Sequence, residues 1–160
     1  LRLTYKTVGA CLSAMDSWLV IRGVKTLALR MEQHQKNAIA LADWLKTQPK
    51  VTKVLFPGLP AHPGYEINKA QTTGFGGMLS FEVDSEETAK QVLEGIKLIQ
   101  FAESLGGTES LLTYPVTQTH PDLKPEDAER KGITRRLLRF SVGIEDTEDL
   151  IADLEQAFNK

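Results

Sequence analysis

The sequence FAESLGGTESLLTYPVTQTH, at residues 101–120, contains the pattern around which we predict the fold. Its short apolar start ends in an acidic residue and a hydroxyl, Glu103 and Ser104, and two adjacent glycines then permit a tight turn. Hydroxyl groups follow at Thr113, Tyr114, Thr117 and Thr119. Packing of a hydrophobic core does not require this arrangement, so we interpret it as a polar wall that faces a ligand.

A second pattern, RLLRFSVGIED at residues 136–146, predicts the last strand of the fold. Alternation along a strand places three apolar side chains on one face: Leu138, Phe140 and Val142. Arg139 lies on the opposite face, with Leu137 and Ser141, where its planar guanidinium could bind a carboxylate through two hydrogen bonds. The alternative is a structural ion pair with one of the 21 acidic residues, and the residues alone favour that alternative.

Periodicity predicts helices and strands along the whole chain. Helices are expected from Ser13, with a break near Gly23, from Thr26 to Gln48, and at residues 65–71, 86–96, 126–131 and 146–158. Strands are expected at residues 51–56, 76–83, 98–102, 110–114 and 136–142. Consecutive strands lie too close in sequence for long crossovers, so we predict an α/β fold (a two-layer α+β arrangement) with a mainly antiparallel sheet and helices on one face.

The composition limits the classes of function. The chain has 160 residues, 41% hydrophobic and 25% charged, which suits a globular domain with a single core. Its net charge of −2 provides no basic surface for nucleic acid or for a membrane. Cys11 is the only cysteine, which is compatible with a reducing cytoplasm, and the three histidines are too far apart in sequence for a zinc motif, so we predict no metal.

Two glycine-containing segments, at residues 104–107 and 74–77, are possible ligand sites. The SLGG turn alone is weak evidence, because it is also an ordinary turn. The glycines at residues 74–77 could form a phosphate loop, but a strand follows them, so no helix N-terminus would hold the anion. We find no reason to identify Lys25 as a Schiff-base lysine.

The segments AESLGGTESLLTYPVTQTH and RRLLRFSVGIEDTEDLIADL resemble the C-terminal part of the cysteine and methionine metabolism family of pyridoxal-phosphate enzymes. VGACLSAMDSWLVIRGVKTLALRMEQH and VLFPGLPAHPGYEINKAQTTGFGGMLSFEV are similar to earlier blocks of that family, so the resemblance covers nearly all of the chain. It implies the small C-terminal domain of a fold-type I enzyme. Residues 1–48 would be an interdomain helical segment and residues 49–160 a substrate-orienting domain, with the cofactor-binding large domain and its Schiff-base lysine upstream.

The resemblance also implies roles for individual residues. Ser104 and Arg139 match the pair that holds the substrate α-carboxylate in the family. Glu103 matches a residue near the distal end of the substrate, and Thr119 matches one close to the arginine. Leu105, in the same turn, is included as a substrate-binding residue. No catalytic, cofactor-binding or metal-binding residue is expected within the 160 residues.

The function implied is pyridoxal-phosphate-dependent transsulfuration in methionine and cysteine metabolism. Cystathionine γ-synthase or O-acetylhomoserine thiol-lyase is the leading expectation, and cystathionine β- or γ-lyase is the alternative within the family. A stand-alone amino-acid-binding regulatory module is the alternative from another class. We further expect a small amino-acid substrate, a cytoplasmic homotetramer at full length, and no activity from these residues without the upstream lysine.

Overall fold

The computed structural model describes residues 1–9 and 11–160, which form two compact units, Leu1–Arg30 and Met31–Lys160. The first unit contains α1 (Arg2–Val8), α2 (Ala14–Val24) and the start of α3 (Leu27–Leu45). Ser13 caps α2, as predicted: its Oγ accepts a hydrogen bond from the Asp16 amide at 3.1 Å. The break expected near Gly23 is confirmed, because α2 ends at Val24 and α3 begins at Leu27.

The apolar side chains of α2 are exposed within this unit. They are Met15, Trp18, Leu19, Val20, Ile21 and Val24. None of the residues of α2 is buried. The first unit therefore differs from the second, in which the amphipathic helices bury their apolar faces.

The described part of the second unit contains a five-stranded sheet with the strand order β1-β2-β5-β4-β3. The strands are β1 (Val51–Leu55), β2 (Met78–Val83), β3 (Gln100–Phe101), β4 (Leu111–Thr113) and β5 (Leu137–Ser141). Three of the neighbouring pairs are antiparallel, which confirms the predicted sheet. The β3–β4 pair is parallel, contrary to the argument from short connections. A parallel return is possible here because β3 has only two residues and the connection turns through Gly106, which has φ +77°.

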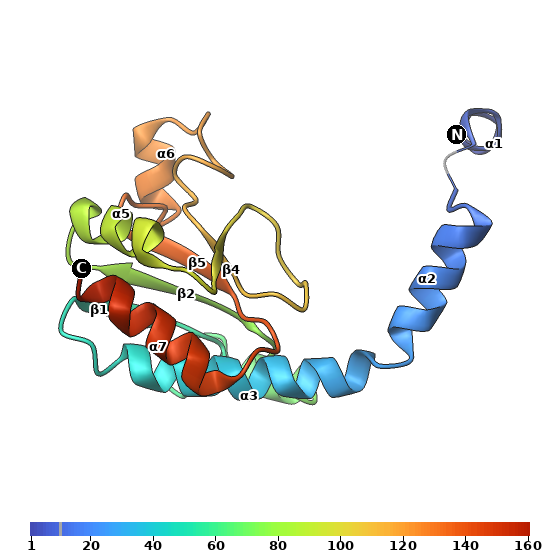
Figure 1. The fold of residues 1–160 in the computed structure, drawn as a ribbon. Coiled ribbons are helices and arrows are strands. Elements are labelled where there is room, and N and C mark those ends of the chain that lie inside the picture. The colour runs from blue at the N-terminus through green and yellow to red at the C-terminus, as the bar shows by residue number, and fades with distance from the viewer. Residues whose placement is uncertain (10) are drawn as a thin grey trace. The chain divides into compact units, whose positions relative to one another are not determined.

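Four helices follow or separate these strands: α4 (Tyr65–Gln71), α5 (Glu86–Gly95), α6 (Pro125–Arg130) and α7 (Thr147–Phe158). Figure 1 shows α5 and α7 side by side on one side of the sheet. Their contact is close, because a Cβ added at Gly95 would lie 2.8 Å from the Cα of Ala157. Three of these helices begin at the predicted signals. Ser85 caps α5, Asp146 caps α7, and Pro125 is at the start of α6.

One hydrophobic core lies between the sheet and α3, α5 and α7. Phe81 from β2 and Leu138 and Phe140 from β5 are completely buried in it. The helices contribute Ala38, Leu41, Ala42, Leu45, Ala89, Val92, Leu150, Leu154 and Ala157. This arrangement confirms the predicted fold class of a sheet with helices on one face.

The division between the two units lies earlier than the domain boundary expected from the sequence. The units separate after Arg30, within α3, whereas the sequence suggested residue 48. The reason is that the second half of α3 packs into the core of the sheet through residues such as Leu41 and Leu45. The roles of residues 1–48 as an interdomain segment and of residues 49–160 as a substrate-orienting domain remain predictions.

None of the described helices is long and apolar enough to cross a membrane. Over residues 1–9 and 11–160, no group of three or more His, Cys, Asp or Glu side chains is arranged to hold a metal ion.

Candidate functional site

Arg139 lies in the middle of β5, on the face opposite the core. Its neighbours across the sheet are Ser80 in β2 and Thr113 in β4. Its Nη2 donates hydrogen bonds to Thr113 Oγ1 at 2.9 Å and to the backbone carbonyl of Glu103, with a longer contact of 3.4 Å to the carbonyl of Ser104. Nε is buried and has no hydrogen-bond partner in the described structure. One side of the guanidinium is therefore anchored, and Nε still lacks an acceptor.

Among the described residues, Arg139 does not form the ion pair that the residues alone favoured. In the part of the chain that the structure describes, the salt bridges use Asp43, Glu82, Glu86 and Asp127 as acids, and none of them involves Arg139. The contacts of Arg139 are a hydroxyl and two backbone carbonyls, which carry no net charge. A buried donor of a charged group without an acceptor is costly, so an anion at Nε would stabilise this arrangement.

The loop at residues 103–107 lies beside Arg139, as the sequence predicted. It is fixed at its other end by β5, because the Gly106 amide donates a hydrogen bond of 2.8 Å to Ser141 Oγ. Glu103 and Ser104 contact Arg139 through their backbone carbonyls, whereas their side chains and that of Leu105 are exposed. Direct substrate contacts of the three side chains remain predictions.

The other predicted hydroxyls do not form one polar wall. Thr113 contacts Arg139, but the Tyr114 hydroxyl donates to the Arg135 carbonyl at 2.8 Å. Thr117 and Thr119 bond to carbonyls of their own turn. The prediction of a wall was wrong because short-range turn carbonyls compete for these hydroxyls. Thr119 also bonds His120 Nδ1 at 2.7 Å, and its expected proximity to Arg139 remains a prediction.

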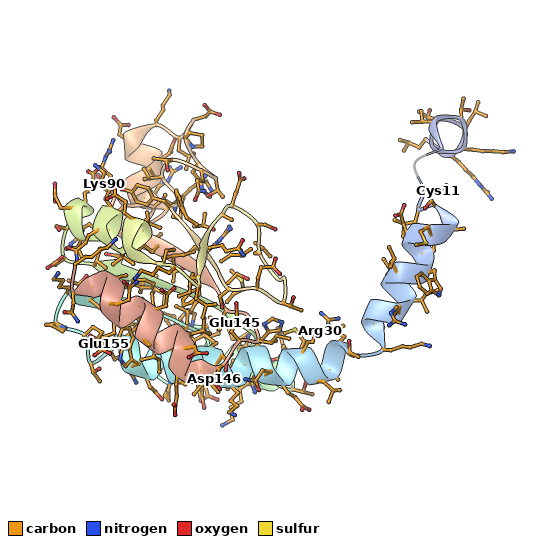
Figure 2. All side chains as sticks on the ribbon, in the orientation of Figure 1. Cys11, Arg30, Lys90, Glu145, Asp146 and Glu155 are labelled. Atoms are coloured by element: carbon orange, nitrogen blue, oxygen red, sulfur yellow. The ribbon has the colours of Figure 1, made fainter. Side chains whose placement is uncertain are left out.

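A network that sequence reasoning missed supports the end of β5. The Glu145 carboxylate accepts hydrogen bonds from the Ser110 amide at 2.6 Å and from its hydroxyl at 2.8 Å, and Ser110 Oγ accepts one from the Gly143 amide at 2.8 Å. Figure 2 shows Glu145 just before α7, close to α3. Gly143 has no space for a side chain, since a Cβ would lie 2.4 Å from the Thr108 carbonyl oxygen and 2.6 Å from the Ser110 amide. The network therefore joins the start of β4 to the end of β5.

Helix α3 holds the same end of β5 from the other side. The Asn37 amide donates to the carbonyls of Gly143 at 3.1 Å and Glu145 at 2.8 Å. His34 Nδ1 lies 2.6 Å from the Val142 carbonyl oxygen. Both side chains are buried. The signal that could have identified them is the presence of two polar residues, three positions apart, on the buried face of a helix.

The start of β3 is held by Asp153 of α7. Its carboxylate accepts hydrogen bonds from the amides of Lys97 at 2.8 Å, Leu98 at 2.9 Å and Ile99 at 2.8 Å. Asp153 is 7% exposed, and these three amides, together with the Gln156 side-chain amide at 3.2 Å, satisfy its almost fully buried carboxylate. This contact fixes the strand that leads into the 103–107 loop.

The titratable groups with shifted pKa values lie away from Arg139, around Tyr114. Burial raises the pKa of the Tyr114 phenol, and the nearby Glu86 carboxylate adds to the rise. Hydrogen bonding to Lys90 lowers the pKa of Glu86, with a further contribution from Arg135. These groups lie near the hydrogen bond that the Tyr114 hydroxyl donates to the Arg135 carbonyl, two residues before β5.

The profile of the "Cys/Met metabolism PLP-dependent enzyme" family matches residues 1–159. The chain belongs to this family. Cystathionine gamma-synthase of Haemophilus influenzae is 56% identical over 94% of this chain and 36% of its own length. Cystathionine beta-lyase of Lactococcus lactis subsp. cremoris is 49% identical over 96% of this chain and 40% of its own length.

Solved structures of the family have the same fold as this chain. A putative O-acetylhomoserine (thiol)-lyase of Campylobacter jejuni, which contains a pyridoxyl-lysine phosphate group, gives a TM-score of 0.91 at 34% identity over 97% of this chain and 37% of that one. Cystathionine gamma-lyase of Lactobacillus plantarum complexed with L-serine gives 0.90 at 42% identity, over 96% and 40%. The chain spans between 36% and 42% of the length of the curated relatives that it matches.

Pyridoxal phosphate is the cofactor of this family. The glycines at residues 74–77 lead into β2 and not into a helix N-terminus, so they do not provide a phosphate site of that kind. The Nε of Arg139, which is buried without a partner in the described structure, suits an anionic acceptor such as a carboxylate.

Proposed function

We propose that this chain is the substrate-orienting part of a pyridoxal-phosphate-dependent transsulfuration enzyme in methionine and cysteine metabolism. The proposed activity is that of a cystathionine γ-synthase or an O-acetylhomoserine thiol-lyase. Arg139 would bind the α-carboxylate of the amino-acid substrate, with Ser104 as a second contact. Glu103, Leu105 and Thr119 would line the rest of the substrate site.

The observation that carries this proposal is the state of the Arg139 guanidinium. Nη2 is held by acceptors from β4 and from the 103–107 loop, while the buried Nε has no partner in the described structure. A carboxylate oxygen placed at Nε would accept its hydrogen bond and pair with the charge of the guanidinium. A structural arginine of the core would already have these contacts.

In this proposal the residues of the chain contribute orientation. The cofactor, when bound, stores the electrons released when a bond at the substrate Cα breaks. Arg139 fixes the carboxylate and therefore the rotation of the substrate about Cα, which selects the bond that breaks. Positioning of this kind can lower a barrier by several kcal/mol.

A cystathionine β- or γ-lyase is the second candidate within the family. It is supported by relatives of nearly equal similarity: the cystathionine gamma-lyase of Dictyostelium discoideum is 48% identical over the whole of this chain. The same carboxylate contact would serve these reactions, because their substrates are also α-amino acids. The residues at the distal end of the substrate, including Glu103, would have to distinguish them.

The test is a product assay of the complete gene product with pyridoxal phosphate. One reaction contains O-acetyl-L-homoserine and L-cysteine, and the other contains L-cystathionine alone. We expect cystathionine from the first. Homocysteine and pyruvate from the second would identify a β-lyase, and cysteine and 2-oxobutanoate a γ-lyase.

The regulatory alternative makes a different prediction for the same assay. A stand-alone amino-acid-binding module would bind its ligand but release no product and show no cofactor absorbance. That result would overturn the proposed enzyme. A homotetrameric state and a cytoplasmic location remain predictions for the complete protein, which gel filtration with light scattering and cell fractionation would test.

A further inference from the structure

We propose that Thr113 is a positioning residue for Arg139: its hydroxyl holds Nη2 and thereby fixes the plane of the guanidinium before the substrate carboxylate binds. This inference rests on the proposed carboxylate-binding role of Arg139. It adds a residue that the resemblance did not assign. Thr113 is completely buried in β4 and lies directly across the sheet from Arg139.

The direction of the two hydrogen bonds of Thr113 carries the argument. A threonine hydroxyl has one proton to donate and lone pairs to accept with. Thr113 Oγ1 donates to the Ala102 carbonyl at 2.7 Å, at the end of β3. Its proton is therefore used, and the oxygen can only accept from Arg139 Nη2, at 2.9 Å. The hydroxyl is a fixed acceptor that cannot rotate to become a donor.

This fixed acceptor determines which part of the guanidinium is free. Nη2 is held between Thr113 and the Glu103 carbonyl, so the planar group cannot rotate about its long, flexible stem without losing both contacts. Nε, which belongs to the same rigid plane, is left buried without an acceptor. An arginine that is oriented before the ligand arrives loses less conformational freedom on binding.

A purely structural role for Thr113 has a distinguishable consequence. The bond from Thr113 to Ala102 also joins β4 to β3, so loss of the hydroxyl would lower stability in either case. A structural role would be independent of Arg139 and would not change the Michaelis constant of the folded enzyme. A positioning role requires that the effect on substrate binding disappear when Arg139 is absent.

The test uses the complete, cofactor-loaded protein and the Michaelis constant for O-acetyl-L-homoserine, or for L-cystathionine if the product assay finds a lyase. Thr113→Val keeps the shape and removes the hydroxyl, and Thr113→Ser keeps the hydroxyl. We expect KM to rise about 10-fold in the valine variant, as for the loss of one hydrogen bond to a charged group, with kcat changing much less. The serine variant should restore most of the wild-type KM.

The same substitution in an Arg139→Ala background is the decisive measurement. There we expect Thr113→Val to have no further effect on KM, because the hydroxyl acts through the guanidinium. An equal rise in both backgrounds, or a failure of serine to restore KM, would overturn the inference. If the valine variant does not fold, Thr113→Cys replaces it, because a thiol is a weak hydrogen-bond acceptor. Its KM is then compared with that of Thr113→Ser in the same two backgrounds.

The two proposals can fail separately. If Arg139→Ala leaves KM unchanged, the carboxylate role of Arg139 is wrong, and the positioning role is wrong with it. If Arg139→Ala raises KM but neither Thr113→Val nor Thr113→Cys does, Arg139 binds the carboxylate without help from Thr113, and only this inference is overturned.

Discussion

The two faces of β5 are made by alternate residues of one five-residue strand, and they differ in what they leave unsatisfied. On the core face, Leu138 and Phe140 are completely buried among apolar side chains. On the opposite face, Arg139 has a buried Nε with no partner in the described structure, although the neutral groups around it hold Nη2. The difference supports our proposal that the core face maintains the fold and that the Arg139 face binds a ligand. Substitutions on the two faces should therefore change different measurements.

The largest effect should come from the core face. Phe140→Ala removes a ring that is completely buried against the helices, and we expect a loss of about 3–5 kcal/mol in the free energy of unfolding. Urea denaturation measures this loss. The kcat/KM of the remaining folded enzyme should change little, with Phe140→Leu as the milder control. A normal stability for the alanine variant would show that this face is not the one that maintains the fold.

On the opposite face, Arg139→Ala should reduce kcat/KM by roughly 2–5 kcal/mol if the carboxylate is buried on binding. Arg139→Lys keeps the charge but loses the planar pair of donors, so its loss should be intermediate. Steady-state kinetics measure the loss, and thermal unfolding should show a much smaller change. If Arg139→Ala instead unfolds the protein while the folded remainder keeps its normal KM, the residue is structural.

Asp153 is a buried carboxyl group that contrasts with Arg139, because the protein supplies all of its hydrogen-bond donors. Asp153→Ala leaves the amides of Lys97, Leu98 and Ile99 without their acceptor. We expect a loss of about 1–3 kcal/mol in the free energy of unfolding, measured by urea denaturation. Glu155→Ala, an exposed position two residues further along α7 (Figure 2), is the matched control and should be close to neutral. Equal effects at the two positions would contradict the role of Asp153.

A smaller effect is expected at Ser104, whose side chain is exposed in the loop beside Arg139. A neutral hydrogen bond to the substrate carboxylate would contribute about 0.5–1.5 kcal/mol, so Ser104→Ala should raise KM modestly. Substrate titration of the variant measures this change. A melting temperature that falls in step with activity would show that Ser104 is a turn residue.

The smallest effect should be the contribution of the surface pair of Glu86 and Lys90 to the melting temperature, which depends on pH. Hydrogen bonding to Lys90 lowers the pKa of Glu86 in the folded protein, so the pair stabilises the fold above the unfolded-state pKa of 4.5. This contribution is lost as the pH falls through the lowered pKa. Wild type should melt slightly above Glu86→Gln at pH 7, and the difference should disappear in acid and shrink at high salt. A difference that grows in acid would contradict this sign.

The sequence was sufficient for those features that depend on local patterns. The alternation in β2 and β5, the caps at Ser13, Ser85 and Asp146, and the limits of α4 were all predicted and confirmed. The parallel pairing of β3 and β4 was missed, because it depends on the path of the loop that connects them and not on periodicity.

The candidate site could be predicted only in part, because it depends on contacts between residues that are distant in sequence. The position of Arg139 on the outer face of β5 and the SLGG loop beside it followed from alternation and resemblance. The hydrogen bonds from Asn37 to Gly143 and Glu145, and from Ser110 to Glu145, join residues between 35 and 108 positions apart, and no local signal pairs them. The hydroxyls after the turn were misassigned for a related reason, since nearby carbonyls competed for them.

Gly143 and Gly106 should behave differently under saturation mutagenesis and selection for activity. At Gly106 the backbone has a positive φ but a Cβ would meet nothing within 4 Å, so asparagine and aspartate, which tolerate that conformation best, should be the first survivors. At Gly143 the obstacle is backbone atoms within 2.6 Å of the missing Cβ, which no choice of side chain relieves. Glycine alone should therefore be recovered at position 143, and a revertant of any substitution there should restore glycine itself.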